Sequence, residues 1–258
     1  MKLSRGLMKS EMPKTGCIAM LGGLFEPTKR TLRMIIAIDG PAGAGKGTTA
    51  KLVAGELGFA YVDTGAMYRA VALRAHELGF HAPRDAAQIA ELAAKVPIHF
   101  GPGATQVICD GHDYSSFIRT PQVGELASKV AVLGDVRHHI VERQRVIGLE
   151  AQNEFGGAVL EGRDIQTVVF PDATLKIFLT ASPDARASRR LLQWQKNHQS
   201  GDLEDALRDI LKRDERDSTR DTSPLKPAED AVHISTDHAT PQQVAAQIVE
   251  LARQRMGN

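Results

Sequence analysis

The sequence predicts an α/β fold built on a parallel sheet that helices cover on both faces. Three observations predict it: short β-rich runs alternate with longer helical patterns, the first β-rich run (34–39, MIIAID) is almost entirely apolar, and no repeat unit recurs along the chain. Strands of this apolar kind are typical of sheets buried on both faces. Alternation of strand and helix is typical of parallel βαβ units.

The expected elements follow one another in chain order. The strand over 34–39 is followed by a helix over 46–57, which a glycine ends. A second strand over 59–62 and a second helix over 65–78 repeat this unit. Later strands are expected over 157–160, 174–180 and 231–235, and later helices begin at Pro183, Leu203 and Pro241.

The middle of the chain interrupts this alternation. Three β-rich runs separated by Gly-Pro-Gly and Asp-Gly turn signals, and then one long helix, are expected over 96–100, 106–110, 113–118 and 121–150. Antiparallel strands beside a long helix indicate an inserted subdomain, over about residues 72–150. The core would then be formed by 34–71 and 151–258.

Length and composition limit the class of protein. The 258 residues are enough for one sizeable domain with a buried core. Apolar residues make up 42% and charged residues 24%, ordinary globular values that exclude a disordered, collagenous or disulfide-stapled chain. The two cysteines, Cys17 and Cys109, form no CxxC pair. They favour a reducing compartment, so we expect a cytoplasmic protein.

The first 33 residues differ from the rest in charge. They hold seven of the 32 basic and two of the 31 acidic residues, so residues 34–258 carry 25 basic against 29 acidic, a net charge of −4. We expect 1–33 to be an N-terminal extension, disordered or a mis-assigned start, and 34–258 to be a single folded domain. The acidic balance argues against a nucleic-acid partner. The longest apolar run, 17–25, is too short to span a membrane.

A glycine-rich turn after the first strand is the strongest functional signal. It contains GxxxxGK and opens a helix, the context in which this motif binds nucleotide phosphates. The glycines let backbone N–H groups converge on an anion, the helix N-terminus adds positive charge, and the lysine reaches the β- and γ-phosphates. We predict that ATP is bound by Gly40, Pro41, Ala42, Gly43, Ala44, Gly45, Lys46, Gly47 and Thr48.

One departure from the common P-loop is informative. Gly47 follows Lys46 at the position where that loop has a Ser or Thr that ligates Mg²⁺, and Thr48 comes one position later. We therefore expect Mg²⁺ to be held by nucleotide oxygens and water, with no protein ligand. A GTPase would need an NKxD motif, and none of the three asparagines begins one, so that class is excluded.

Several arginines are candidates for binding a second phosphate. An acceptor that is itself a phosphate calls for arginine, whose planar fork binds oxygens in pairs. Arg69 and Arg163 lie in the segments DTGAMYR and EGRD. Arg213, Arg216 and Arg220 recur at helical spacing, although spacing alone favours a solvated, salt-bridged helix face.

Five segments together resemble the bacterial-type cytidylate kinases, nucleoside monophosphate kinases of the P-loop class. They are DGPAGAGKGT (39–48), DTGAMYR (63–69), IRT (118–120), EGRDI…TVVFPDA (161–173) and RDERDSTR (213–220). The P-loop alone would indicate only a superfamily, whereas the second and fourth segments are much more specific. Two positions depart from the family pattern: Ala42, where some members have serine, and Pro121, which affects the start of the long helix.

The resemblance implies a five-stranded parallel sheet flanked by helices, a nucleotide-binding insertion with short antiparallel strands, and a short lid over about 189–202. It implies transfer of the γ-phosphoryl group of MgATP to CMP or dCMP. We expect a monomer, because the reaction cycle needs an insertion and a lid that move freely. The CMP-binding residues would be Asp63, Arg69, Ser128, Arg137, Arg163, Asp164, Arg213 and Asp217. Within that set Arg69 and Arg163 would bind phosphate, Ser128, Arg137 and Asp164 would face cytosine, and Arg213 and Asp217 the ribose. The catalytic residues would be Lys46, Arg163 and Arg220.

The choice of base follows from hydrogen-bond polarity. Cytosine offers an exocyclic amine and an unprotonated ring nitrogen, and uracil reverses both. A carboxylate (Asp164) beside a guanidinium (Arg137) would suit cytosine and leave uracil mispaired. Two alternatives stay open: a P-loop kinase for AMP, UMP or a non-nucleotide alcohol, and a nucleotide-dependent regulatory or nucleic-acid-remodelling ATPase.

Overall fold

The fold is seen in a computed structural model that describes residues 33–101, 106–196 and 199–257. Its main sheet has five parallel strands in the order β2-β6-β1-β7-β8. Their bounds are β1 (Met34–Asp39), β2 (Ala60–Asp63), β6 (Gly157–Gly162), β7 (Leu175–Thr180) and β8 (Val232–Ser235). The predicted parallel sheet is therefore confirmed, and β1 lies at its centre. All but the last residue of the expected 1–33 extension lie outside the described residues.

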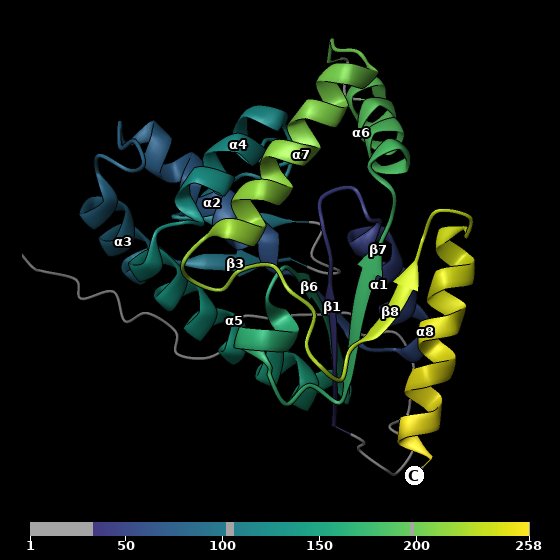
Figure 1. Cartoon of the computed structure of the whole chain (residues 1–258). Coiled ribbons are helices and arrows are strands. Elements are labelled where there is room, and N and C mark those ends of the chain that lie inside the picture. The colour runs from purple at the N-terminus through teal and green to yellow at the C-terminus, as the bar shows by residue number, and fades with distance from the viewer. Residues whose placement is uncertain (1–32, 102–105, 197–198, 258) are drawn as a thin grey trace, which may run out of the picture.

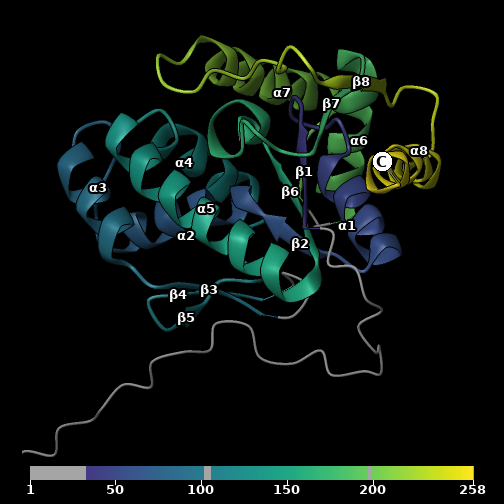
Figure 2. The same cartoon turned by 90° about the horizontal axis from the view of Figure 1, so that it is seen from below.

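Helices cover both faces of this sheet, as the apolar β1 predicts. Ile36 and Ile38 pack into one core with helices α1 (Lys46–Leu57) and α8 (Pro241–Met256), whereas Ile35 packs into a second core with α5 (Gly134–Phe155). Because successive strand side chains point to opposite faces, one strand supplies both cores. Figures 1 and 2 show the sheet between these two helical layers.

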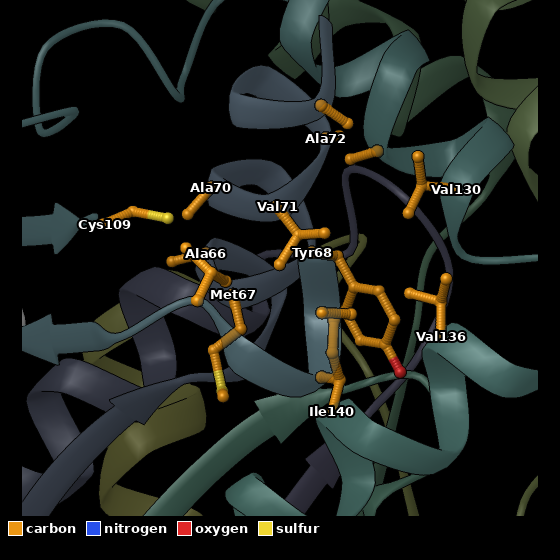
Figure 3. Packing of buried hydrophobic residues seen from close by; sticks show 14 of the residues in the cluster. Ala66, Met67, Tyr68, Ala70, Val71, Ala72, Cys109, Val130, Val136 and Ile140 are labelled. Atoms are coloured by element: carbon orange, nitrogen blue, oxygen red, sulfur yellow. The ribbon is translucent and has the colours of Figure 1, made fainter. Parts of the chain in front are cut away.

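The inserted part of the chain has a hydrophobic core of its own. It comprises α2 (Thr64–Glu77), α3 (Ala86–Lys95), α4 (Pro121–Val130) and a small antiparallel sheet of β3 (Ile98–Phe100), β4 (Val107–Cys109) and β5 (His112–Asp113). The buried cluster runs from Ala66 to Ile140, and Figure 3 shows Tyr68 between Val136 and Ile140 at its centre. This cluster supports an inserted subdomain, and its bounds of about 72–150 stay a prediction.

Two expectations in this insertion are wrong. The third strand is only His112–Asp113, because Tyr114 turns inward, where its hydroxyl contacts Glu77 and residues 115–119 form turns. The single long helix over 121–150 is two helices, α4 and α5. The break after α4 leaves the carbonyl of Ala131 free of a helical donor, and Arg137 of α5 donates to it at 3.1 Å.

Helices α6 (Pro183–Lys196) and α7 (Leu203–Thr219) begin at the predicted residues and pack against each other above the sheet (Figure 1). Asp202 caps α7, since its carboxylate accepts from the Asp205 backbone N–H at 2.8 Å. Trp194 packs between the two helices with Ala187, Ala206 and Ile210. The predicted lid, 189–202, covers the junction of these helices, of which residues 197–198 lie outside the described part.

Candidate active site

The predicted site residues lie along one edge of the main sheet, where the parallel strands end. The P-loop (40–48) connects β1 to α1, Asp63 ends β2, and residues 161–164 lie at the end of β6. Ligands bind at this carboxyl edge in open α/β sheets. Helices α6 and α7 rise above the same edge (Figure 1), so donor and acceptor segments distant in sequence meet here.

The P-loop backbone requires glycine at two positions. Gly40 has φ 152° and Gly43 has φ 78°, in the region that glycine favours. A Cβ atom on Gly40 would lie 2.2 Å from the carbonyl oxygen of Leu179, and one on Gly43 would lie 2.9 Å from Cβ of Arg186. The loop therefore packs closely on β7 and α6 and delivers the chain to the start of α1 at Lys46.

Lys46 is buried beneath this loop. Its Nζ donates to the carbonyl oxygens of Gly40 at 2.8 Å and Pro41 at 2.7 Å. Burial, with help from Arg163, lowers the pKa of Lys46 to about 7, although nearby carboxylates including Glu161 oppose the shift. An anion placed in the loop would favour the charged form of this lysine.

The P-loop is also tied to both helices above it. The backbone N–H of Ala42 donates to Asp214 of α7 at 3.0 Å, and its carbonyl accepts from Arg186 of α6 at 3.0 Å. Arg186 and Asp214 in turn form a short ion pair. Neither Arg186 nor Asp214 was predicted, because nothing local marks two side chains on different helices as partners of a loop.

A cleft of about 510 Å³ opens beside the P-loop. Its walls include P-loop residues 42–45, Arg189 of α6, Arg213 of α7 and Thr236 after β8. Arg189 fixes one wall, since it donates to the hydroxyl of Thr236 at 2.9 Å and to its carbonyl at 2.5 Å. The position of the cleft suits a nucleotide whose phosphates lie in the P-loop, and we call it the donor cleft.

Two arginines meet on Asp63 at the end of β2. Arg69 donates to both carboxylate oxygens at 3.0 and 3.1 Å, and Arg119 donates to one at 3.1 Å. Burial acts to raise the pKa of Asp63, but the two guanidinium groups outweigh it, so the pKa lies below its usual value. Asp63 thus holds two arginine side chains at the end of β2. Arg119 lies in the IRT segment (118–120), for which no role was predicted.

Arg137 and Asp164, the predicted base-reading pair, are in contact. Arg137 of α5 is 2% exposed and donates to Asp164 through a short hydrogen bond, and its guanidinium lies 5.2 Å from the ring centre of Tyr68. Burial acts to lower the pKa of Arg137, but Tyr68 and Asp164 raise it above its usual value. A second cation, Arg220, lies 4.0 Å from the same carboxylate.

The face of α7 that carries the predicted arginines meets the segment that follows β6. Arg163 donates to Asp217 at 2.9 Å, and Arg220 lies 3.5 Å from the other oxygen of Asp217. Asp217 and Arg220 are buried, so this is not a solvated face. The half-buried Arg213 lines the donor cleft, and its Nε has no hydrogen-bond partner among the described residues. Withdrawal from water, together with Arg163, lowers the pKa of Arg213 to about 10.

Ser128 joins the site from α4. Its hydroxyl accepts from Arg216 of α7 at 2.7 Å, and the same guanidinium contacts Glu125 at 3.2 Å. Arg216 therefore bridges α7 to α4. Its spacing alone could not distinguish a phosphate-binding residue from one on a solvated helix face. The contact with Arg216 fixes the hydroxyl of Ser128 against α7.

Among residues 33–101, 106–196 and 199–257, no three His, Cys, Asp or Glu side chains lie together as a metal-binding group. No helix in this part of the chain is long and apolar enough to cross a membrane.

Known proteins with similar sequences carry the name of the family that these motifs resemble. A bifunctional pantoate ligase/cytidylate kinase of Synechococcus sp. (strain JA-3-3Ab) is 48% identical over 231 residues, which are 88% of this chain and 42% of that relative. The cytidylate kinase of Thermotoga maritima is 46% identical over 86% of this chain and 97% of the relative. That of Limosilactobacillus fermentum is 47% identical over 83% and 92%. The chain thus spans less than half of the bifunctional relative and nearly all of the other two.

The solved structures that are similar to this chain share less of its sequence. A shikimate kinase from Acinetobacter baumannii is 16% identical, with a TM-score of 0.39 over 86% of this chain and 93% of that one, too low to support any conclusion. The sequence pattern of the cytidylate kinase family, by contrast, matches residues 36–254. This range covers nearly the whole described fold, including the P-loop and the arginine-rich sheet edge. The chain belongs to the cytidylate kinase family.

Proposed function

We propose that this chain transfers the γ-phosphoryl group of ATP to CMP or dCMP and releases ADP with CDP or dCDP. The observation that carries the proposal is the buried pair of Arg137 and Asp164 at the same sheet edge as the P-loop. Relatives of similar length bear the name cytidylate kinase, which supports the same reaction here.

The base is read by charge and hydrogen-bond polarity. Asp164 accepts from the exocyclic amine of cytosine, and Arg137 donates to its unprotonated ring nitrogen. Ser128 adds a hydroxyl on the α4 side. Uracil would place a carbonyl against the carboxylate and an N–H against the guanidinium, and mispaired charged groups in a dry site cost about 1–3 kcal/mol or more each.

The acceptor phosphate binds among arginines from three elements. Arg69 and Arg119 are already held in parallel by Asp63, and Arg163 is held by Asp217. An arginine fixed by a carboxylate loses less freedom when it binds a phosphate. On the ribose side we assign Asp217 and Arg213, the latter from its place between the donor cleft and α4.

The transfer itself needs alignment and positive charge more than covalent chemistry. Lys46 neutralises the donor phosphates, and Arg163 and Arg220 neutralise charge that spreads over the transferring phosphoryl oxygens. The segment 189–202 acts as a lid over the donor cleft, so that water is excluded during transfer. The chain works as a monomer.

Mg²⁺ accompanies ATP in this reaction. The chain offers oxygen atoms that fit such a cation: one carboxylate oxygen of Asp39 is buried without a hydrogen-bond partner among the described residues, and the carboxylate of Glu161 lies beside Gly47 in the first turn of α1. When bound, Mg²⁺ would neutralise negative charge on the donor phosphates.

The proposal is tested by ADP formation. The full chain is given MgATP and, separately, CMP, dCMP, UMP, AMP and GMP, with a control that has no acceptor. We expect turnover with CMP and dCMP far above that with UMP. A different preferred acceptor would leave the P-loop assignment standing and overturn the base-reading pair. Equal ADP formation without an acceptor would point to an ATPase instead.

A further inference from the structure

Ala42 joins the P-loop to both helices above it. Its backbone N–H donates to Oδ1 of Asp214 on α7 at 3.0 Å, and its carbonyl oxygen accepts from the guanidinium of Arg186 on α6 at 3.0 Å. Its side chain is buried and belongs to the apolar cluster that contains Trp194 of α6 and Ile210 of α7. One residue of the loop is therefore joined to α6 and α7 by two hydrogen bonds and by apolar packing.

The two charged residues that hold Ala42 also hold each other. Arg186 and Asp214 form a short ion pair, in which the side chains are 6% and 20% exposed. The Nε of Arg186 donates to the carbonyl oxygen of Ala181, just after β7, at 3.1 Å. A shift of α7 relative to the loop would leave the buried guanidinium without its charged partner, which is strongly unfavourable. The pair therefore keeps α7 in one position above the P-loop.

Helix α7 also carries residues of the acceptor side. Arg213 directly precedes Asp214 on this helix. Asp217 follows on it and accepts from Arg163 at 2.9 Å, and Arg220 is the C-cap. Figure 1 shows α7 running from its junction with α6 toward α4, across the carboxyl edge of the sheet. Because hydrogen bonds hold successive turns of a helix together, the place of these side chains relative to the P-loop depends on the contact at Asp214.

We infer that Asp214 and Arg186 are positioning residues for phosphoryl transfer. By holding Ala42, they set the acceptor-side face of α7 at a fixed place relative to donor phosphates in the P-loop. In-line transfer requires this alignment, and a misplacement of about 1 Å slows a reaction by about 100-fold. The inference rests on the proposed function, because it takes ATP as the donor and CMP as the acceptor.

The test separates the transfer step from substrate binding. CDP formation in a single turnover is followed by rapid quench at saturating MgATP, and the full chain is raised over CMP until the rate is constant. Asp214→Asn keeps an oxygen for Ala42 but loses the charge that holds Arg186, so we expect this rate to fall by about 10- to 100-fold. The Kd of ATP, measured by calorimetry, should stay as in the wild type. An unchanged rate, or a loss that saturation restores, would overturn the inference.

A second ion pair between the same two helices provides the matched control. Asp209 of α7 accepts from Arg190 of α6 at 3.0 Å, and the side chains are 26% and 13% exposed. Neither side chain forms a hydrogen bond with the P-loop within the described part of the chain. Asp209→Asn should therefore weaken the contact between the helices, as Asp214→Asn does, but keep the transfer rate of the wild type. An equal fall in both variants would contradict the inference, since it would reflect helix packing alone.

A conservative variant keeps the test decisive if Asp214→Asn does not fold. Arg186→Lys keeps a positive charge for Asp214, but a single ammonium lacks the planar fork that also donates to Ala42 and Ala181. We expect slower transfer while far-ultraviolet circular dichroism stays unchanged, and an unchanged rate would contradict the inference. No CDP from the wild type would overturn the proposed function and this inference with it, whereas equal rates in the wild type and the variants would overturn the inference alone.

Discussion

Asp164→Asn tests the base-reading pair with the least change in shape. Asparagine keeps the side-chain volume and one accepting oxygen, but it removes the negative charge that faces Arg137 and Arg220. Both guanidinium groups are almost fully buried, at 2% and 8% exposure, so water replaces little of the lost interaction. The amide of the introduced asparagine can also rotate and donate a hydrogen bond to a uracil carbonyl.

The size of the effect follows from these contacts. A hydrogen bond to a charged group contributes about 1.5–3 kcal/mol. The ratio of kcat/KM for CMP to that for UMP should therefore fall by about 10- to 150-fold. Steady-state ADP formation measures the ratio, and Asp172→Asn, an exposed position eight residues along the chain, is the control. If kcat/KM fell equally for both acceptors, Asp164 would support the fold of the site without reading the base.

Three further predictions concern stability, measured by urea unfolding. Gly148→Ala should destabilise the fold by about 1–3 kcal/mol, because its Cβ would lie 2.6 Å from an aromatic ring, whereas Gly55→Ala, with open space around it, should stabilise α1 by about 0.5–1 kcal/mol. Equal changes in unfolding free energy for Gly148→Ala and Gly55→Ala would refute the argument that close packing requires glycine at 148. Asp214→Asn should lower stability by about 1–3 kcal/mol, since Arg186 loses its charged partner, and no loss would mean that the pair contributes nothing. Burial raises the pKa of Asp39 to about 6 from 3.8, so the stability of the wild type relative to Asp39→Asn should be greatest below pH 3.8, fall as the pH rises through 6, and level off above it; a flat difference would contradict this.

The parts of the fold that local signals specify could be predicted from the sequence. Helices α6, α7 and α8 begin at the predicted residues, because a proline, or a capping residue just before the helix, marks each start. The strand β1 is equally clear, since its run of MIIAID is almost entirely apolar. These signals suffice for the parallel sheet and for the helices around it.

Tertiary contacts decided what the sequence could not predict. Between 121 and 150 only isolated glycines such as Gly134 signal a break, and these are too weak to predict a helix end at Val130. The break is stabilised by Arg137, which donates to the carbonyl of Ala131. The helix Ala86–Lys95 was also not predicted, although its Ala, Leu, Glu and Lys residues favour a helix and Asp85 precedes it.

The candidate site, like the fold, could be predicted from the sequence only in part. The P-loop and the arginines of DTGAMYR and EGRD lie in continuous motifs, so their place at the sheet edge follows from the topology. Arg186 and Asp214 hold the P-loop from two helices and form no motif. Glu161 lies within a recognised segment, but its closeness to Gly47 depends on how β6 and α1 pack, which no spacing in the sequence reveals.

The most direct test of the central claim is a competition followed by ³¹P nuclear magnetic resonance. The full chain is incubated with MgATP and equal concentrations of CMP and UMP. The account predicts that the CMP signal declines while CDP and ADP grow in equal amounts and the UMP signal persists. Consumption of UMP at the rate of CMP, or growth of inorganic phosphate in place of CDP, would contradict it.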